Sequence, residues 1–292
     1  MSHKRSRWAI YAYVLPAAIF ILAVTIFPMV YSIYVSFQDY ILQTRTMTFI
    51  GLRNFADVFK DARFYQSLLI TFKIGVPALI LEVVLGFAAA LLLSSINKGR
   101  EILTSLLATP VMIAPAAAAM SWNMLYTPDW GPINHILGIP FGHLLTIDWL
   151  GNTQIAPFSI AIADIWQMTP FIMLILLAGL LGISEELYEA ARIDGASGWD
   201  IFRYITLPLI RMPLGVAVLL RAIDLFKLFD LPYVMTHGGP ASSTETISFY
   251  TYQIGIRFFR VGYGAALALI LLILVIIMSR FLVRYVRQEA EA

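Results

Sequence analysis

The sequence contains no cysteine. Disulfides, catalysis by a thiol and metal sites built on thiolates are therefore excluded. Charged residues are scarce as well: they make up 13% of the 292 residues, whereas about 25% is usual in soluble domains. The formal net charge is only +2, so the composition does not indicate the basic surface typical of nucleic-acid binding. Because 60% of the residues are hydrophobic, lipid must be the solvent for much of the chain.

The common catalytic and nucleotide-binding motifs are missing too. The sequence has no Gly-x-x-x-x-Gly-Lys-Ser/Thr phosphate loop, no His-Glu-x-x-His zinc motif and no Gly-x-Ser-x-Gly nucleophile elbow. Its four histidines are scattered, at positions His3, His135, His143 and His237. We therefore expect no enzyme, no metal site and no cofactor bound by this chain. Without a phosphate loop, the chain is not expected to bind ATP in that manner.

Six segments have the roughly 20 mostly apolar residues that a membrane-spanning helix needs: 8–37, 67–96, 102–126, 155–183, 207–235 and 262–286. They are continuous and rich in Ala and Leu, without the alternation of a membrane β-barrel. The prolines inside them predict kinks, because neighbouring helices re-satisfy the freed backbone groups. The first segment is too long for a secretory signal and shows no cleavage site, so it predicts a retained helix. We expect an all-α membrane protein with about six spans and a single transmembrane domain over residues 1–292.

Lysine and arginine are unevenly distributed among the connections, which sets the orientation. The connections 127–154 and 236–256 have neither residue. The loop after the first span is an exception, with Arg45, Arg53, Lys60 and Arg63 partly offset by Asp39, Asp57 and Asp61. The balance predicts that both termini are cytoplasmic. The positive residues then placed inside are Lys4, Arg5, Arg7, Lys98, Arg100, Arg192, Arg203, Arg211, Arg280, Arg284 and Arg287.

The connection between the fourth and fifth spans, residues 184–208, predicts two short helices of about ten residues with a sharp turn between them. Ser184 is a candidate N-cap, and the acidic residues that follow it suit the positive end of a helix dipole. Gly195 suits the left-handed position that ends a helix. Ser197 and Asp200 have the spacing of a capping box that opens the next one. The pattern predicts a rigid projection that docks into a groove of a partner.

The same connection resembles a family signature: Glu-Ala-Ala, three residues, Gly, nine residues, Ile, any residue and Leu-Pro. It is similar to the coupling loop of permease subunits of binding-protein-dependent ABC importers. The resemblance implies a cytoplasmic segment that sits in a cleft of an ATPase, with Glu189 as the polar anchor and Gly195 as the turn. The coupling residues that it implies are Glu189, Ala190, Ala191, Asp194, Gly195, Ile205, Leu207 and Pro208.

Other stretches resemble one branch of that family, the maltose/glycerol-3-phosphate type, and within it the first, larger permease of the pair. They include the Asp39-Tyr40 pair, the segment 51–55, the His-Gly-Gly-Pro run at 237–240 and the segment 262–266. The resemblance implies the type I ABC importer permease fold, an inner-membrane location and a carbohydrate substrate moved by alternating access. It also implies the partners: a second permease as heterodimer, two ATPase subunits carrying ATP and Mg, and a periplasmic solute-binding protein.

Charged residues inside the predicted spans need an explanation, since each costs about 2.5–3.5 kcal/mol at mid-bilayer. The fifth span carries Arg221, Asp224, Lys227 and Asp230 at steps of three. We predict that they pair along the helix or face the protein interior, and two readings stay open: assembly, or direct contact with substrate by at least one of them. Glu82 has no basic residue at helical spacing, so its partner should be Arg221 or Lys227 on another helix.

A sugar path needs aromatic faces and groups that bond hydroxyls. Residues of the third, fourth and fifth spans have that composition, although tryptophan is also an ordinary anchor at a membrane interface. The candidate path residues are Trp122, Asn123, Asp164, Trp166, Gln167, Asp224 and Lys227.

Two other functions are alternatives to the importer permease that the resemblance implies. A secondary transporter driven by an ion gradient would explain the buried charges but not the 189–208 loop, and no inverted repeat is visible. A membrane sensor or assembly factor that transports nothing would be expected not to copurify with an ATPase.

Overall fold

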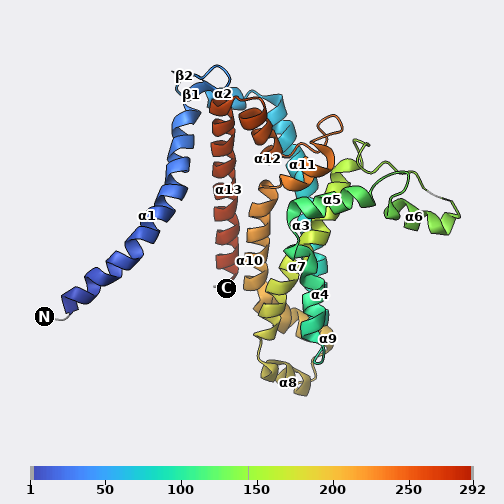
Figure 1. The fold of residues 1–292 in the computed structure, drawn as a ribbon. Coiled ribbons are helices and arrows are strands. Elements are labelled where there is room, and N and C mark those ends of the chain that lie inside the picture. Colours follow the sequence, from blue (N-terminus) through green and yellow to red (C-terminus); the bar gives the residue numbers. More distant parts are fainter. Residues whose placement is uncertain (1–2, 144, 291–292) are drawn as a thin grey trace. The chain divides into compact units, whose positions relative to one another are not determined.

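The computed structural model describes residues 3–143 and 145–290 and is mostly helical (Figure 1). The chain divides into two compact units. The first comprises residues up to 62 together with 251–273, and the second comprises 63–250 and the residues from 274 onward. The last helix, α13 (Val261–Ala290), contributes to both. The side chains of Lys4, Arg5, Arg7 and Arg287, four of the basic residues predicted to be cytoplasmic, lie outside the described part of the structure.

The first unit contains a β-hairpin and a short helix that the sequence did not lead us to expect. After α1 (His3–Ser36), strands β1 (Gln38–Ile41) and β2 (Thr46–Phe49) pair antiparallel, and α2 (Arg53–Val58) follows. Asn54 is buried, and its amide donates to the carbonyls of Ser36 and Gln38, both at 2.9 Å. The hairpin is thereby fixed to the end of α1, and η3 (Gln253–Arg257) completes the unit.

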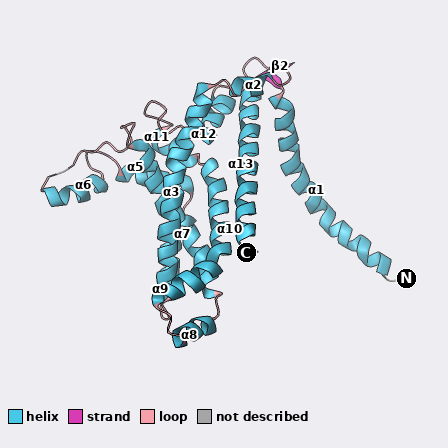
Figure 2. Cartoon of the chain, turned by 180° about the vertical axis from the view of Figure 1, so that it is seen from behind, coloured by secondary structure: helices cyan, strands magenta, loops and turns pink. Residues whose placement is uncertain are grey.

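The second unit is a helical bundle in which α7 lies against α4 and α10, and α5 packs on α11 (Figures 1 and 2). The short helices α8 and α9 lie together at one end of it in both views. Its elements are α3 (Ala62–Ser94), α4 (Arg100–Met112), α5 (Pro115–Leu125), α6 (Pro132–Gly138), η1 (Ile139–Phe141), α7 (Ala156–Leu181), α8 (Glu185–Ile193), α9 (Gly198–Ile201), η2 (Phe202–Thr206), α10 (Leu207–Phe226), α11 (Asp230–Thr236) and α12 (Ile247–Tyr252).

The helical membrane class is confirmed, but the number of apolar spans is lower than the six expected. Among residues 3–143 and 145–290, four helices are long and apolar enough to cross a membrane: α1, α3, α7 and α13. The pair α4 and α5, bent by 91°, counts as a fifth span if it is taken as one. The predicted span 207–235 is not one of these helices. In its place α10 ends at Phe226 and carries three charged residues, Arg211, Arg221 and Asp224, so it is not apolar enough.

The bend between α4 and α5 corrects the prediction that proline only kinks the spans. Pro115 opens α5, and the two residues before it, Ile113 and Ala114, are extended, as expected before a proline. The Nε2 atom of Gln167 on α7 donates to the carbonyl of Ile113 at 2.9 Å. This bond satisfies one backbone group that the break would otherwise leave unpaired in an apolar setting. The other predicted kinks lie inside helices, at Pro16, Pro28, Pro77, Pro110, Pro170 and Pro213.

Within the described part of the second unit, two apolar clusters lie one after the other along the bundle. The cluster nearer α8, here the proximal core, includes Ala90 of α3, Ile172 of α7 and Ile210 of α10. The distal core lies further from α8 along the same three helices and includes Ile74 and Leu225. The same helices therefore contribute to both cores, one after the other along their length.

Candidate functional site

The segment from Ser184 to Ile201, here called the elbow, turns as the sequence predicts. Gly195 has a φ of +81°, in the left-handed region. The amide of Gly195 donates to Arg192 O at 3.1 Å, and the amide of Ala196 donates to Ala191 O at 2.9 Å. These two bonds form a Schellman motif, which satisfies the last carbonyls of α8 and fixes the exit direction of the chain.

A capping box opens the helix that follows, and the prediction from Ser197 and Asp200 is confirmed. The amide of Asp200 donates to Ser197 Oγ at 3.3 Å, and the amide of Ser197 donates to Asp200 Oδ2 at 3.0 Å. Ser197 Oγ also lies 2.5 Å from that carboxylate oxygen. The hydrogen bonds from the Ser197 side chain and backbone hold the pKa of Asp200 below its usual value.

Two details of the elbow differ from the prediction. Ser184 occupies the N-cap position in an extended conformation, but its side chain makes no capping bond. The second helix is not a separate element of ten residues: α9 runs through the π-helical turn η2 directly into α10. Because apolar residues continue past Ile201 and Pro208 is tolerated in the first turn of α10, nothing ends the helix there.

The predicted coupling residues divide into two groups in the structure. Four of them are exposed: Glu189, Ala190, Asp194 and Gly195. The rest are half-buried: Ala191, Ile205, Leu207 and Pro208. The elbow and the turn after it also expose three large apolar side chains that the sequence reading did not single out: Ile193 (85% exposed), Trp199 (65%) and Tyr204 (70%). The sequence did contain a signal for these exposed side chains, because large apolar residues stand out in a connection that is otherwise polar and charged.

The elbow projects from the end of the bundle (Figure 2). A polar hollow of about 420 Å³ separates α8 from the ends of α3 and α7, and its lining includes Ser94, Arg100, Glu185 and Arg192. A hydrogen-bond contact of 3.4 Å between the hydroxyls of Tyr188 and Thr206 links α8 to the turn before α10. Through this contact α8 touches the turn that leads into α10.

The candidate path residues on α5 and α7 are partly brought together. The rings of Trp122 and Trp166 meet edge to face with centroids 5.8 Å apart. Tyr126 extends this aromatic group from Trp122, at 5.2 Å, to Trp149, at 5.4 Å. Asn123 and Trp166 are exposed, so an aromatic face and an amide are available at the surface of the unit.

Two other candidates are buried and already engaged. Gln167, 1% exposed, is the donor to Ile113 described above. Asp164, 2% exposed, contacts Arg221. Their polar groups are directed at the protein, and their assignment to a sugar path stays a prediction.

The buried contact of Asp164 belongs to a triad of charges from three helices, here called the ion triad. Arg221 of α10 donates from Nε to Glu82 Oε2 at 2.7 Å and from Nη2 to Glu82 Oε1 at 2.9 Å. The same Nη2 donates to Asp164 Oδ2 of α7. The side chains are at most 3% exposed. The prediction that Glu82 of α3 finds its partner on another helix, Arg221 or Lys227, is confirmed for Arg221.

The remaining charges of the fifth segment lie at the surface of the unit. Asp224 and Lys227 form an exposed i,i+3 pair at 3.6 Å, and Asp230 lies in the first turn of α11. The predicted pairing along the helix is thus confirmed for Asp224 and Lys227. Neither partner is buried, so both are available to a ligand or a neighbouring chain.

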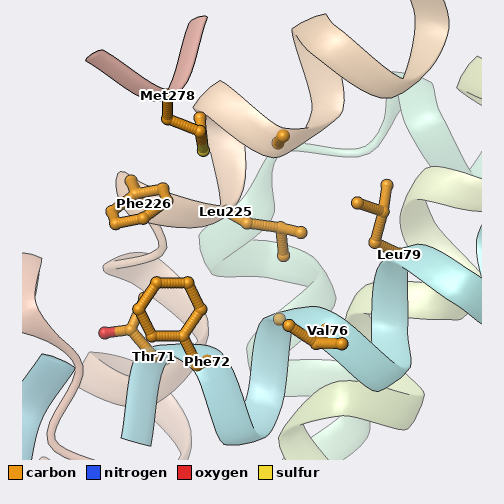
Figure 3. A pocket seen from close by; sticks show the side chains of 9 residues that line it. Thr71, Phe72, Val76, Leu79, Leu225, Phe226 and Met278 are labelled. Atoms are coloured by element: carbon orange, nitrogen blue, oxygen red, sulfur yellow. The ribbon is translucent and has the colours of Figure 1, made fainter. Parts of the chain in front are cut away.

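A cavity of about 100 Å³ lies between α3 and α10, with Met278 of α13 at its side (Figure 3). Its walls are apolar, including Phe72, Leu79 and Leu225. The hydroxyl of Thr71 accepts a hydrogen bond from the Ile247 amide at 2.9 Å. Such walls give a sugar no hydroxyl partners, so this cavity is not a candidate for the sugar site.

Comparisons with known proteins agree with this architecture. Residues 69–290 match the family model described as "Binding-protein-dependent transport system inner membrane component". The trehalose/maltose transport system permease protein MalF of Thermococcus litoralis is 37% identical over 269 residues, covering 91% of this chain and 89% of the relative. The trehalose transport system permease protein SugA of Mycobacterium tuberculosis is 33% identical over 273 residues, covering 92% and 86%.

Solved structures show the same fold. A chain of a bacterial ABC transporter involved in the import of the acidic polysaccharide alginate superposes with a TM-score of 0.85 at 22% identity, covering 97% of this chain and 96% of that one. An alginate ABC transporter in complex with an alginate pentasaccharide-bound periplasmic protein gives 0.81 at 20% identity, covering 95% and 93%. Because the family model covers most of the chain and the fold matches across its whole length, this chain belongs to the family of binding-protein-dependent transport system inner membrane components.

Proposed function

We propose that this chain is the permease subunit of an ATP-driven importer that carries a sugar or oligosaccharide across the bacterial inner membrane by alternating access. The relatives named above are sugar transport permeases, and the solved neighbours import a polysaccharide. Trehalose, maltose and alginate share polyhydroxylated rings, which suit the half-buried ring of Trp122 and the exposed side chains of Asn123 and Trp166. Asp224 and Lys227 are further candidates for contact with hydroxyls.

The observation that carries the proposal is the elbow. It is exposed, rigidly capped on both sides of its turn and continuous with α10. We propose that α8 docks in a cleft of an ATPase subunit, with Glu189 as the polar anchor. Glu189 forms no ion pair or side-chain hydrogen bond with any other residue among 3–143 and 145–290, so its carboxylate is available to a partner.

The rest of the assembly follows from this role. Two ATPase subunits would carry ATP and Mg, a second permease would enclose the path with this chain, and a periplasmic binding protein would deliver the sugar. Closure of the ATPases on ATP would move the elbow and with it α10, and hydrolysis would reset the path.

The test is uptake by proteoliposomes that contain this chain with its second permease, ATPase and binding protein, using labelled trehalose and maltose. We expect Glu189→Lys and Gly195→Pro to insert normally but to lose ATP-driven uptake. Glu101→Lys, an exposed charge reversal on α4, is the matched control and should transport as wild type does. Normal uptake by Glu189→Lys would contradict the coupling role.

The alternatives give different outcomes in the same system. Uptake that continues without ATP and stops when the ion gradient collapses would select a secondary transporter. A chain that copurifies with no ATPase would favour a sensor or assembly factor. Because the sequence has no cysteine, Ala190→Cys can be labelled without background. Labelling of Ala190→Cys by an impermeant maleimide from the periplasmic side would contradict the cytoplasmic position of the elbow.

A further inference from the structure

The ion triad lies at the boundary between the two apolar cores of the second unit. On each of its three helices, the charged residue falls between a residue of the proximal core and a residue of the distal core. The order along the chain is Ala78, Glu82, Ala90 on α3; Ala163, Asp164, Ile172 on α7; and Ala217, Arg221, Leu225 on α10. On these three helices, the ion triad therefore forms a polar level between the two apolar cores.

The geometry at this level is specific. The guanidinium group of Arg221 meets both oxygens of Glu82 in a bidentate arrangement and still reaches Asp164. This fork fixes the distance and the rotation of α10 relative to both α3 and α7, as a single apolar contact would not. The polar level therefore defines the position of α10.

Stability alone does not account for these charges. Burying ions is costly, and replacement of a buried ion network by apolar residues of similar size is often neutral or stabilising. The triad moreover combines two carboxylates with a single guanidinium, so its formal charges do not cancel. Such an arrangement points to a role in positioning.

Beside the triad, α10 is loosely packed on the side that faces α3, whereas nearer the elbow it packs tightly against α7, where a Cβ atom on Gly179 would lie 2.7 Å from Pro213. The apolar cavity of Figure 3 lies between α3 and α10, next to the Glu82–Arg221 pair along both helices. By contrast, α3 and α7 approach closely, since a Cβ atom on Gly86 would lie 3.0 Å from the side chain of Ile172. Close-packed interfaces resist displacement, whereas a void has no partner atoms to lose.

The helix that carries Arg221 is also the one that the elbow moves. From Gly198 the chain is helical through η2 to Phe226, so Arg221 lies about 35 Å along a continuous helical path from the beginning of α9. A displacement of the elbow is thus delivered to the polar level with few flexible joints.

We propose that the Glu82–Arg221–Asp164 triad is the positioning joint through which movement of the elbow and the proximal core is transmitted to the distal core. This inference rests on the proposed function. Glu82, Asp164 and Arg221 are positioning residues in it, and none of them needs to touch the sugar.

The main experiment replaces the triad by apolar residues of similar size, Glu82→Met, Asp164→Leu and Arg221→Met together. We expect the triple variant to insert and to melt within a few degrees of wild type, and its ATPase activity to stay within threefold. ATP-driven uptake should fall at least tenfold. Met173→Leu, in the proximal core, is the matched control and should retain uptake within twofold.

A distance measurement separates this inference from the proposed function, because it requires no transport. Spin labels on cysteines introduced at Leu92 and Leu209 report on the proximal side, and labels at Tyr65 and Tyr233 report on the distal side. All four side chains are exposed in the unit. On addition of ATP, both distances should change in the wild-type assembly, and only the proximal distance should change in the triple variant.

Each result decides the question. Uptake within twofold of wild type in the triple variant, or a distal distance that still responds to ATP, overturns the joint. If the wild-type assembly takes up no sugar with ATP, the proposed function fails, and the distance changes still test the joint.

If the triple variant does not fold, the single variants Arg221→Lys and Asp164→Asn replace it. Arg221→Lys keeps the positive charge but loses the bidentate contact with Glu82, so its uptake should fall threefold to tenfold. Full uptake in both overturns the joint.

Discussion

The elbow and the ion triad are both charged, yet they are built in opposite ways. Most residues of the elbow are exposed, and its turn is fixed by hydrogen bonds between residues no more than five positions apart. The triad is buried and joins residues that are 57 and 139 positions apart in the chain. Charges at the elbow can therefore meet a partner from outside, whereas charges in the triad act only on the helices that carry them. Variants in the two regions should accordingly fail in different ways.

The largest effect is expected from Arg221→Met alone. This change leaves Glu82 and Asp164 buried without a cation, and breaking a buried pair in this way costs about 3–5 kcal/mol. Reversible unfolding in detergent micelles should show the loss, together with poor insertion. The contrast is the triple apolar variant, which should unfold close to wild type. Equal stability of Arg221→Met and wild type would show that the two carboxylates do not depend on the guanidinium.

A smaller effect is expected from Gln167→Leu, which removes the donor to Ile113 at the bend between α4 and α5. An unsatisfied buried carbonyl costs about 1–3 kcal/mol. The same unfolding assay measures it, with Gln154→Leu, at an exposed position, as the control. If Gln167→Leu loses no more than Gln154→Leu, the bend does not need this hydrogen bond.

Within the elbow, Gly195→Ala and Gly198→Ala form a matched pair. Neither glycine has an atom within 4 Å of an added Cβ, but only Gly195 has a positive φ. An alanine there is strained by about 1–2 kcal/mol. We expect faster hydrogen exchange of the Ala196 amide and reduced uptake for Gly195→Ala, and near-normal behaviour for Gly198→Ala. Identical hydrogen exchange of the Ala196 amide in the two variants would show that the positive φ of Gly195 does not strain an alanine at that position.

The smallest effect concerns pH at the capping box. Because the pKa of Asp200 is lowered in the folded state, its stabilising contribution is present above the unfolded pKa, about 3.9. The contribution is lost only as the pH falls through the lower folded value. Hydrogen exchange of the Asp200 amide should therefore be protected equally at pH 6 and pH 8 and should lose protection in acid below pH 4. Asp200→Asn should remove this acid step, and a step near neutral pH would contradict it.

Much of the fold was predictable because its signals are local or compositional. Long apolar runs identified the helices α1, α3, α7 and α13, and the Gly195 and Ser197–Asp200 patterns identified the turn of the elbow. The break at Ile113 was missed, because Pro115 is equally compatible with a kink until the partner of the freed carbonyl is known. The hairpin of residues 38–49 was missed because its strands have only four residues each.

More could be predicted from the sequence about the elbow than about the polar residues inside the bundle. The elbow residues could be placed from their spacing alone, and Glu82 could be assigned to either of two cations on another helix. The choice of Arg221, and the burial of Asp164 and Gln167 away from any open path, could not be read from composition, since polar residues in a span serve assembly and ligand binding alike.

A lipid environment, the positions of the long apolar helices α1, α3, α7 and α13 and the turn of the elbow follow from the sequence alone, because they depend on hydrophobicity and on hydrogen bonds between near neighbours. The partners of the buried charges and the boundary between the two cores become known only from the packing of the helices. A buried charge is stabilised by whichever opposite charge that packing brings within hydrogen-bond distance, and this does not depend on separation along the chain.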